Sequence, residues 1–478
     1  MFKINKIAKN FLSVGFANIV SQLLGFLTVV YYARILGKAD FGKISLAQSI
    51  LVYFNMITIF GFQTYGTKLI SKAKDKSNRC KLIGDIVSLR FIIAFLCFLA
   101  SVFIGFFSYK GYDFKNIMIL YGFTLFPLAF NMDWVFSGTQ EMEHNAIYNL
   151  LKNVIPFVLL MLFLKNKGQV YLIPVFTLVA MCFSSIYHQY VLRVKKSIRY
   201  SVGFDYGIGK MYLKAALPFF ISGLLSMINC NVDSIIIGYM RTDGELGLYS
   251  SAYKIVFFLT NVIATIFVPL FPVMIEYKNF KDKECLNNLL KYISKLVVMI
   301  AFPIAMGGII LSKDIILLLF GKEYVNAYIP LIILMLYVLL LFLRETYGYA
   351  LNAWNMEKQY LKTVLISSMV NLILNLILIP VYGIIAAAFT TLISEVINFV
   401  FMQKYVFKVA KTSYLHNFIK IILPTILMSM GIVLMKFLNI SIIVNIIASI
   451  AIYFISVILF KYMTLNEIKS FLKRKNGI

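Results

Sequence analysis

The chain has 478 residues, of which 61% are hydrophobic and only 14% are charged. A soluble globular protein of this length needs polar groups to cover its outside, so the composition excludes that class and favours a protein whose solvent is the lipid bilayer. The net charge of +26 would suggest nucleic-acid binding in a soluble chain. Here the basic residues lie mostly between apolar segments, so we interpret them as topological and expect no nucleic-acid partner.

Apolar segments long enough to cross a bilayer as a helix, about 20 residues each, occur about 14 times. The first covers Phe11–Ile35, the second Ile44–Tyr65, the fourth Ile117–Gly138 and the last Ile442–Phe460. We therefore predict an all-α integral membrane protein with about 14 transmembrane helices.

The two halves of the chain share a weak internal repeat. A shift of 205 residues lays Gly247, Ser250 and Ala252 on Gly42, Ser45 and Ala47. This offset covers six predicted helices, an even number, so the two copies are parallel repeats. We expect two six-helix lobes around a central cavity, plus two C-terminal helices. The predicted divisions are an N-lobe at 1–194, a cytoplasmic linker at 195–211, a C-lobe at 212–410, and the two extra helices with a basic tail at 411–478.

Lysine and arginine are distributed unevenly between the two sides of the predicted membrane. If both termini are cytoplasmic, the inside loops and tails hold roughly three times as many of these residues as the outside turns. The positive-inside rule therefore predicts cytoplasmic termini. The five cysteines are scattered without metal-binding spacing, so we expect neither a disulfide framework nor a metal site.

The chain lacks the common enzyme motifs, with no Walker A loop, no HExxH and no GxSxG. We therefore predict a protein that is not an enzyme, with no catalytic residues, no cofactor and no bound ATP. Its chemistry is expected instead from charges inside the spans, which are costly there and usually face a partner or a cavity. The cations in the predicted spans are Arg90, Lys152, Lys254 and Arg344, and the anions are Asp133, Asp233, Glu345 and Glu395.

Two interpretations of these charges stay open. Opposite charges can pair and lock helices together, or unpaired cations can line a lumen and bind an anionic head group. Arginine suits phosphate through its planar fork, and lysine acts as a point charge. Arg90 and Arg344, from opposite lobes, are the first candidates for substrate binding, followed by Lys152 and Lys254. The four acids are candidates for charge pairing or for binding a coupling H⁺ or Na⁺.

Two further polar features lie in the spans. Trp134 follows Asp133 and is either an interfacial residue or a platform on which a sugar stacks. Asn371 and Asn375 are four residues apart and share a helix face, which favours hydrogen bonding between helices, with ion coordination as the alternative.

Three segments in order along the chain resemble the polysaccharide flippase family, the O-antigen and capsule repeat-unit exporters of the multidrug/oligosaccharidyl-lipid/polysaccharide (MOP) superfamily. They are ARILGKADFG (Ala33–Gly42), DSIIIGYM followed by LGLYSSAYK (Asp233–Lys254), and NLILNLILIPVYGIIAAAFTT (Asn371–Thr391). The resemblance covers nearly the whole chain. It implies a cationic lumen, alternating access and a bacterial cytoplasmic membrane. The implied cargo is an undecaprenyl-pyrophosphate-linked oligosaccharide, moved from the inner to the outer leaflet, with membrane lipids and polysaccharide polymerase or assembly proteins as partners.

Related functions remain alternatives. The lipid II flippase branch is similar in SQLLGF but typically carries arginines in the first helix, where this chain has Gln22 and Thr28. An ion-coupled organic-cation or drug antiporter usually relies on acids in its lumen, and the cations found here favour it less. A scaffold for polysaccharide assembly that transports nothing is the third alternative.

Overall fold

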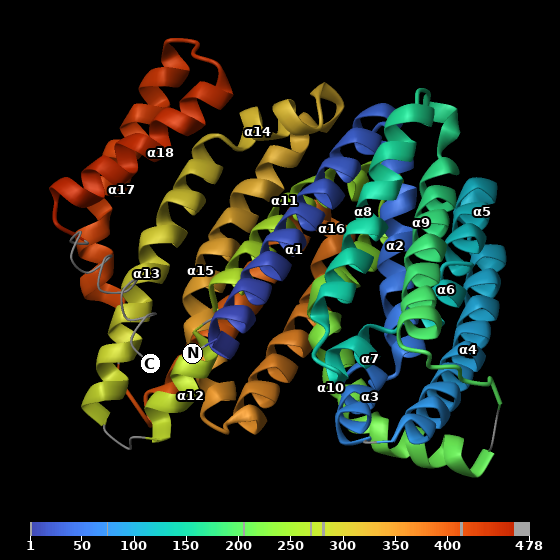
Figure 1. Ribbon diagram of the computed structural model, residues 1–478. Coiled ribbons are helices and arrows are strands. Elements are labelled where there is room, and N and C mark those ends of the chain that lie inside the picture. The colour runs from blue at the N-terminus through green and yellow to red at the C-terminus, as the bar shows by residue number, and fades with distance from the viewer. Residues whose placement is uncertain are drawn as a thin grey trace. The chain divides into compact units, whose positions relative to one another are not determined.

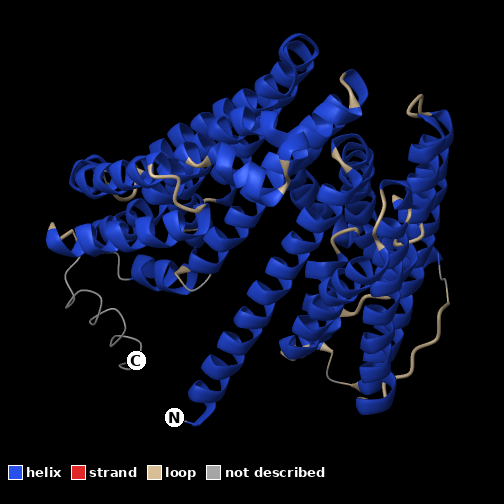
Figure 2. Cartoon of the chain, turned by 90° about the horizontal axis from the view of Figure 1, so that it is seen from above, coloured by secondary structure: helices blue, strands red, loops and turns tan. Residues whose placement is uncertain are grey.

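The computed structural model describes residues 2–73, 75–203, 206–267, 270–279, 283–411 and 414–462. In these ranges every regular element is a helix, as Figure 2 shows. The chain divides into two compact units, Met1–Ser250 and Ser251–Ile478, so the boundary falls inside one helix, α11.

The first unit begins with long helices and continues with several short ones (Figure 1). Its elements are α1 (Phe2–Leu36), α2 (Lys38–Ile59), α3 (Phe62–Lys72), α4 (Lys76–Phe107), α5 (Gly111–Gly122), α6 (Leu125–Ala129), α7 (Asp133–Gly138), α8 (Met142–Phe163), a 3₁₀ turn (Lys167–Gln169), α9 (Leu172–Tyr190), a π-helical turn (Val191–Lys195), α10 (Tyr206–Met240) and the start of α11 (Asp243–Phe267).

The second unit continues from α11. Its further elements are α12 (Phe271–Asn279), α13 (Lys283–Ile310), α14 (Ser312–Leu319), a 3₁₀ turn (Lys322–Ala327), α15 (Tyr328–Ala353), α16 (Glu357–Val406), α17 (Tyr414–Phe437) and α18 (Ile442–Leu459). The helix α16 has 50 residues and bends at Gly383, whose φ of 61° is non-helical. Pro380 lies just before this bend, and the bend divides α16 into the two spans that the sequence predicts, Tyr360–Ile379 and Ile384–Phe401.

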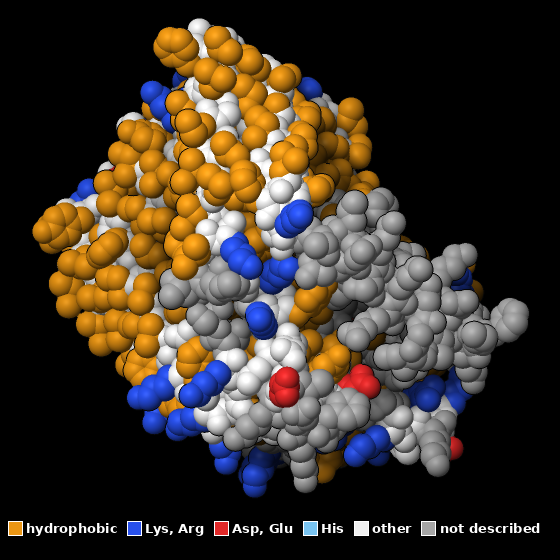
Figure 3. Space-filling view, turned by 90° about the vertical axis from the view of Figure 1, so that its left-hand side faces the viewer, with side chains coloured by type: hydrophobic (Ala, Val, Ile, Leu, Met, Phe, Trp, Pro, Cys, Tyr) orange, Lys and Arg blue, Asp and Glu red, His pale blue; other side chains and the backbone are white. Residues whose placement is uncertain are grey.

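The helices have the length and the surface of membrane-spanning elements. Within the described residues, 11 segments are long and apolar enough to cross a bilayer. Figure 3 shows hydrophobic side chains over the upper part of one face, with lysine and arginine more numerous in its lower half. On α17 and α18 many large apolar residues are exposed, including Met430, Leu434 and Ile447. The chain is therefore a multi-pass membrane protein, as its composition predicts.

Two predicted spans are not single helices. The fourth, predicted as one helix over Ile117–Gly138, consists of α5, α6 and α7, so that prediction was wrong in its continuity. Pro127 lies within α6, and the chain turns at Phe130 before α7 begins. The second span is interrupted after Ile59 by Phe60 and Gly61, both with positive φ. Hydropathy averaged over a window does not record whether backbone hydrogen bonds continue, so it does not reveal such breaks.

Packing around α7 fixes the place of this short helix in the first unit. Trp134 and Phe136 of α7 are buried in one hydrophobic cluster with Phe62 of α3 and Val87 of α4. A Cβ on Gly66 would lie 2.5 Å from the Trp134 ring, so only glycine leaves room for the indole there. The indole consequently holds α7 against α3.

Two helices of the first unit meet backbone to backbone at their first turns. A Cβ on Gly42 of α2 would overlap the carbonyl oxygen of Asp243, and a Cβ on Gly247 of α11 would overlap that of Lys38. The two contacts are reciprocal, and each pair is related to the other by the same 205-residue offset. Small residues allow this approach because a side chain would separate the two backbones.

We expect Gly42→Ala to lower the free energy of unfolding by about 1–3 kcal/mol, because the added methyl overpacks against a backbone carbonyl. Gly244→Ala is the matched control, since its nearest neighbour is the Lys38 side chain at 3.7 Å. Thermal unfolding of the purified protein in detergent measures both. A Gly42→Ala variant as stable as the control would contradict the close approach.

Candidate functional site

The break in the fourth span leaves backbone carbonyls inside the membrane, and Arg90 of α4 satisfies two of them. Its Nη1 donates to the Asn131 carbonyl at 2.9 Å, and its Nη2 donates to the Leu128 carbonyl at 2.7 Å. Arg90 is only 1% exposed. Since lipid offers no hydrogen-bond donor, a buried guanidinium is an effective cap for the end of α6.

A single face of α9 satisfies three further backbone groups of the break. Ser185 donates to the Pro127 carbonyl at 2.7 Å, and Gln189 donates to the Phe130 carbonyl at 3.0 Å. His188 lies between them and bonds on both sides of its ring. Its Nε2 donates to the His144 carbonyl at 3.2 Å, so its Nδ1 accepts from the backbone N–H of Met132, also at 3.2 Å.

These three residues of α9 were missed in the sequence, where the histidines form no cluster. The available signal was their spacing. Positions 185, 188 and 189 are i, i+3 and i+4, so three polar side chains share one face of an apolar helix. Such a polar face predicts a polar partner on a neighbouring helix.

Asp133 begins α7 and accepts from the backbone N–H of Trp134 at 2.8 Å. An acid at a helix N-terminus is favoured by the helix dipole. Its carboxylate also interacts electrostatically with Arg90 and Lys152. Trp134 itself is 0% exposed, so in this conformation its ring is covered by protein. Its predicted stacking on a sugar stays a prediction, and the burial favours a packing role.

Lys152 differs from the other basic residues in the spans. It is the eleventh of the 22 residues of α8, at the middle of that helix, yet its side chain is exposed. No carboxylate within the described residues forms an ion pair with it, although the field of Asp133 reaches it. An exposed lysine at mid-membrane depth is costly in lipid and is typical of a water-filled pathway.

Polar side chains continue from Lys152 along α8 onto α1. Asn149 and Gln22 are also exposed. Asn153 donates to Ser21 Oγ at 2.7 Å, and Ser21 Oγ donates to the Asn149 carbonyl at 2.7 Å. We call Gln22, Asn149 and Lys152 the polar strip. It supplies one cation and two amides to whatever it faces.

Arg344 lies between two acids of the second unit. Its Nη1 is 2.9 Å from Glu345 on the same helix, and its Nε donates to Glu395 of α16 at 2.7 Å. Asn398 contacts the other oxygen of Glu395 at 3.4 Å. Two carboxylates against one guanidinium leave a formal charge of −1. The charge-pairing interpretation thus describes Arg344, Glu345 and Glu395 in this conformation, and binding of substrate by Arg344 stays a prediction.

The remaining predicted site residues lie apart from these groups. Asp233 of α10 is 2% exposed; it accepts a hydrogen bond from the Tyr249 hydroxyl, and the Ser234 N–H donates to it at 2.9 Å. Lys254 is half-buried on α11, within the second unit.

Asn375 of α16 donates to Asn371 at 3.0 Å and accepts from Thr390 across the bend. These asparagines therefore bond within α16. No group of three or more potential metal ligands gathers in the described part of the chain.

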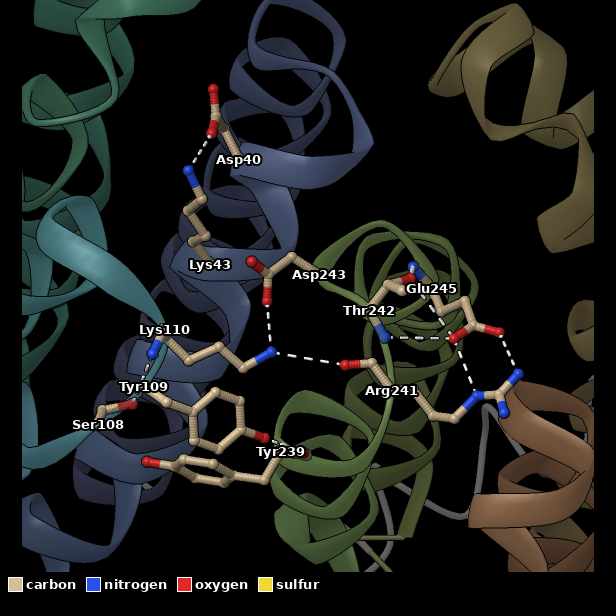
Figure 4. A network of polar contacts seen from close by, with 10 residues as sticks. All are labelled: Asp40, Lys43, Ser108, Tyr109, Lys110, Tyr239, Arg241, Thr242, Asp243 and Glu245. Carbon is tan, nitrogen blue, oxygen red and sulfur yellow. Dashed lines mark hydrogen bonds and ion pairs between the residues drawn. The ribbon is translucent and has the colours of Figure 1, made fainter.

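A second polar network surrounds the Gly42 contact, and Figure 4 shows its members. Lys110, after α4, pairs with Asp243 at the start of α11 at 2.8 Å, and it reaches the Arg241 carbonyl at 3.5 Å. The Tyr109 hydroxyl donates to the Tyr239 carbonyl. Arg241 pairs with Glu245 at 2.8 Å, and this hydrogen bonding raises the pKa of Arg241 above its ordinary value.

Neighbouring charges extend the network on α2. Lys43 bridges Asp40 at 3.0 Å and Asp113 at 2.9 Å, and Tyr171, just before α9, donates to Asp113 at 2.7 Å. Polar side chains thus join α2, α5 and the start of α9 at the end of the unit where α10 ends and α11 begins.

Together, the membrane-spanning helices and the buried charges define a polytopic membrane protein, and solved structures of membrane transporters share its fold. The chain is similar to the lipid II flippase MurJ in an inward closed conformation, with a TM-score of 0.75 and 19% identity. The match covers 97% of this chain and 99% of that one. It is similar to an inward-facing multidrug resistance MATE family transporter of the MOP superfamily with a TM-score of 0.67 and 14% identity, covering 81% of this chain and 95% of that one.

The sequence identifies the family within this fold. The family described as "Polysaccharide biosynthesis protein" matches residues 7–278, so the chain belongs to it, as the motifs predicted. The chain is 26% identical to the capsular polysaccharide biosynthesis protein CapF of Staphylococcus aureus, over 84% of this chain and all of that one. It is 22% identical to "Probable low-salt glycan biosynthesis flippase Agl15" of Haloferax volcanii, over 84% and 83% of the two chains. This is a family of transporters and not of enzymes.

We expect Arg90→Ala to destabilise the protein by about 3–5 kcal/mol, because it leaves two buried carbonyls and the Asp133 charge without their partner. Lys81→Ala removes an exposed cation from the same helix and should change the thermal midpoint little. A folded Arg90→Ala variant with a normal midpoint would show that Arg90 does not support the broken span.

We also expect Lys110 and Asp243 to be coupled. Each charge reversal, Lys110→Asp or Asp243→Lys, should destabilise the protein, and the double variant should recover about 0.5–3 kcal/mol of that loss. Only 8% of the Lys110 side chain and 20% of the Asp243 side chain are exposed, so salt should screen the pair weakly. A double-mutant cycle on thermal unfolding measures the coupling, and additive effects would contradict the pairing.

Proposed function

We propose that this protein is a flippase that moves polyprenyl-pyrophosphate-linked oligosaccharide repeat units from the inner to the outer leaflet of the cytoplasmic membrane by alternating access. Membership of the polysaccharide biosynthesis protein family supports this proposal, as do the capsule and glycan functions named for its relatives. The proposal includes about 14 spans arranged as two parallel six-helix repeats with two further helices, a bacterial membrane, and both termini in the cytoplasm.

The observation that carries the proposal is the polar strip of α1 and α8. A pyrophosphate-linked sugar presents negative charge beside many hydroxyl groups. Lys152 offers a positive charge to the phosphates, while Asn149 and Gln22 offer amides that can donate to and accept from hydroxyls. All three side chains are exposed on apolar helices, and this cost supports a surface along which a polar cargo passes.

The other cations contribute differently to this proposal. Arg90 is committed to backbone carbonyls, and the charge of Arg344 is offset by two acids. We therefore place Lys152 first among the candidate substrate cations, ahead of the two arginines that the sequence favoured.

The energetics of this transport are favourable. Carrying negative charge outward is downhill when the cell interior is negative, by about 2.3 kcal/mol per charge for each 100 mV. The proposed route therefore needs no ATP bound to this chain, and an H⁺ or Na⁺ gradient would add to the driving force.

Drug export is the competing function. The likeness to the MATE transporter shows a shared fold at 14% identity and does not select a cargo. The same limit applies to MurJ and lipid II at 19% identity. The polar strip carries a cation and no acid, which favours an anionic cargo over an organic cation.

We expect Lys152→Ala to reduce export of the lipid-linked sugar at least tenfold, and Lys152→Arg to retain most of it, because arginine keeps the charge at this position. Lys165→Ala, which removes an exposed lysine just after α8, is the matched control. Surface polysaccharide in a deletion strain complemented at equal protein level gives the first readout, and leaflet exchange in vesicles gives the second. Full export by Lys152→Ala would overturn the role of the strip. Drug sensitivity of the deletion strain with normal polysaccharide would instead indicate an antiporter.

A further inference from the structure

A cavity of about 430 Å³ lies at one end of the first unit, away from the polar strip. Its walls come from the end of α3, the first turn of α4, the turn between α7 and α8, and the chain just after α9. Figure 1 shows α3 and α7 together at this end. The orientation predicted from the distribution of lysine and arginine places this end on the cytoplasmic side. The volume is within the range of small-ligand sites.

The floor and the rim of this cavity differ in character. Val135, Phe136, Leu192 and Ile198 form an apolar floor, and each is at most 6% exposed. The rim is polar, with Arg79 and Lys196 as its cations. A ligand that fits both surfaces has an anionic group joined to less polar atoms, as the head of a phospholipid has.

Arg79 is oriented for such an anion. Its Nε donates to the Ala73 carbonyl at 2.8 Å, which anchors the guanidinium at the rim. Among the described residues, neither of its terminal nitrogens has a hydrogen-bond or ion-pair partner. A planar fork held at its base with two free nitrogens is suited to phosphate oxygens.

Lys196 adds a second charge, and one acid accompanies it. Lys196 forms an ion pair with Glu141, and Thr139 donates to the same carboxylate at 3.0 Å. Counting Arg79, Lys196 and Glu141, the rim has a formal charge of +1. That value matches a phosphodiester, which carries a single negative charge. It matches a pyrophosphate less well, because that group carries more charge and would face Glu141.

The geometry points to a second ligand site in this cavity, one that binds the phosphodiester head group of an anionic phospholipid from the inner leaflet. Arg79 binds the phosphate oxygens, Lys196 approaches from the other side, and the glycerol region covers the apolar floor. Bound there, the lipid would join α3, α4 and the turn before α8 to the chain that leads toward α10. This site is independent of the cargo proposed above and does not require it.

The test uses the purified full chain in neutral detergent, with thermal stabilisation and native mass spectrometry as readouts. Phosphatidylglycerol should stabilise the protein and remain bound, whereas phosphatidylcholine with the same acyl chains should do so far less. The double variant Arg79→Gln/Lys196→Gln should bind phosphatidylglycerol at least tenfold more weakly. Lys68→Gln/Lys72→Gln is the matched control, because it removes two exposed lysines of α3 that do not line the cavity.

A second variant separates the cavity from its charges. Ser71→Trp keeps every charge but fills the space, so it should also weaken binding. Equal phosphatidylglycerol binding by the parent and the Arg79→Gln/Lys196→Gln variant would overturn the site, and so would an equal loss in the lysine control. Stabilisation by inorganic phosphate or pyrophosphate alone, lost in the same variant, would overturn the lipid assignment in favour of a soluble anion.

Discussion

A backbone carbonyl inside a bilayer must find its hydrogen-bond donor within the protein, and the first unit is built around that requirement. The break between α6 and α7 exposes carbonyls that a continuous helix would have satisfied. Arg90 reaches them from α4, and Ser185 and Gln189 reach them from α9. The break therefore ties three helices together. It also sets the place where Asp133 begins α7, and hence the field that acts on Lys152.

Three of the four basic residues of the spans do three different things, although they look alike in the sequence. Arg90 replaces missing backbone donors, Arg344 is balanced by two carboxylates, and Lys152 is exposed beside amides. The cost of burying a charge explains the division. A cation that is fully enclosed needs acceptors around it, and only a cation with access to water keeps its charge available for a cargo.

The contact between α2 and α11 shows how a repeated sequence gives a reciprocal contact. Gly42 and Gly247 occupy equivalent places in their helices, and each admits a carbonyl from the other helix. The ion pair of Lys110 with Asp243 lies beside this contact. Close backbone packing supplies the geometry, while the charges around it add specificity, because a displaced helix would lose its partner.

The sequence by itself determined the membrane class, the helical fold and the family. The length of apolar segments, the distribution of charges and the motifs at Ala33–Gly42 and Asn371–Thr391 are all contained in short stretches of sequence. They can therefore be recognised without coordinates. The tertiary structure alone decided which charges are satisfied. Whether Arg344 meets Glu395, 51 residues away, or His188 meets Met132, 56 residues away, depends on which helix faces pack together. It also revealed the break in the predicted span Ile117–Gly138, because hydropathy records how apolar a segment is and not whether its backbone hydrogen bonds continue.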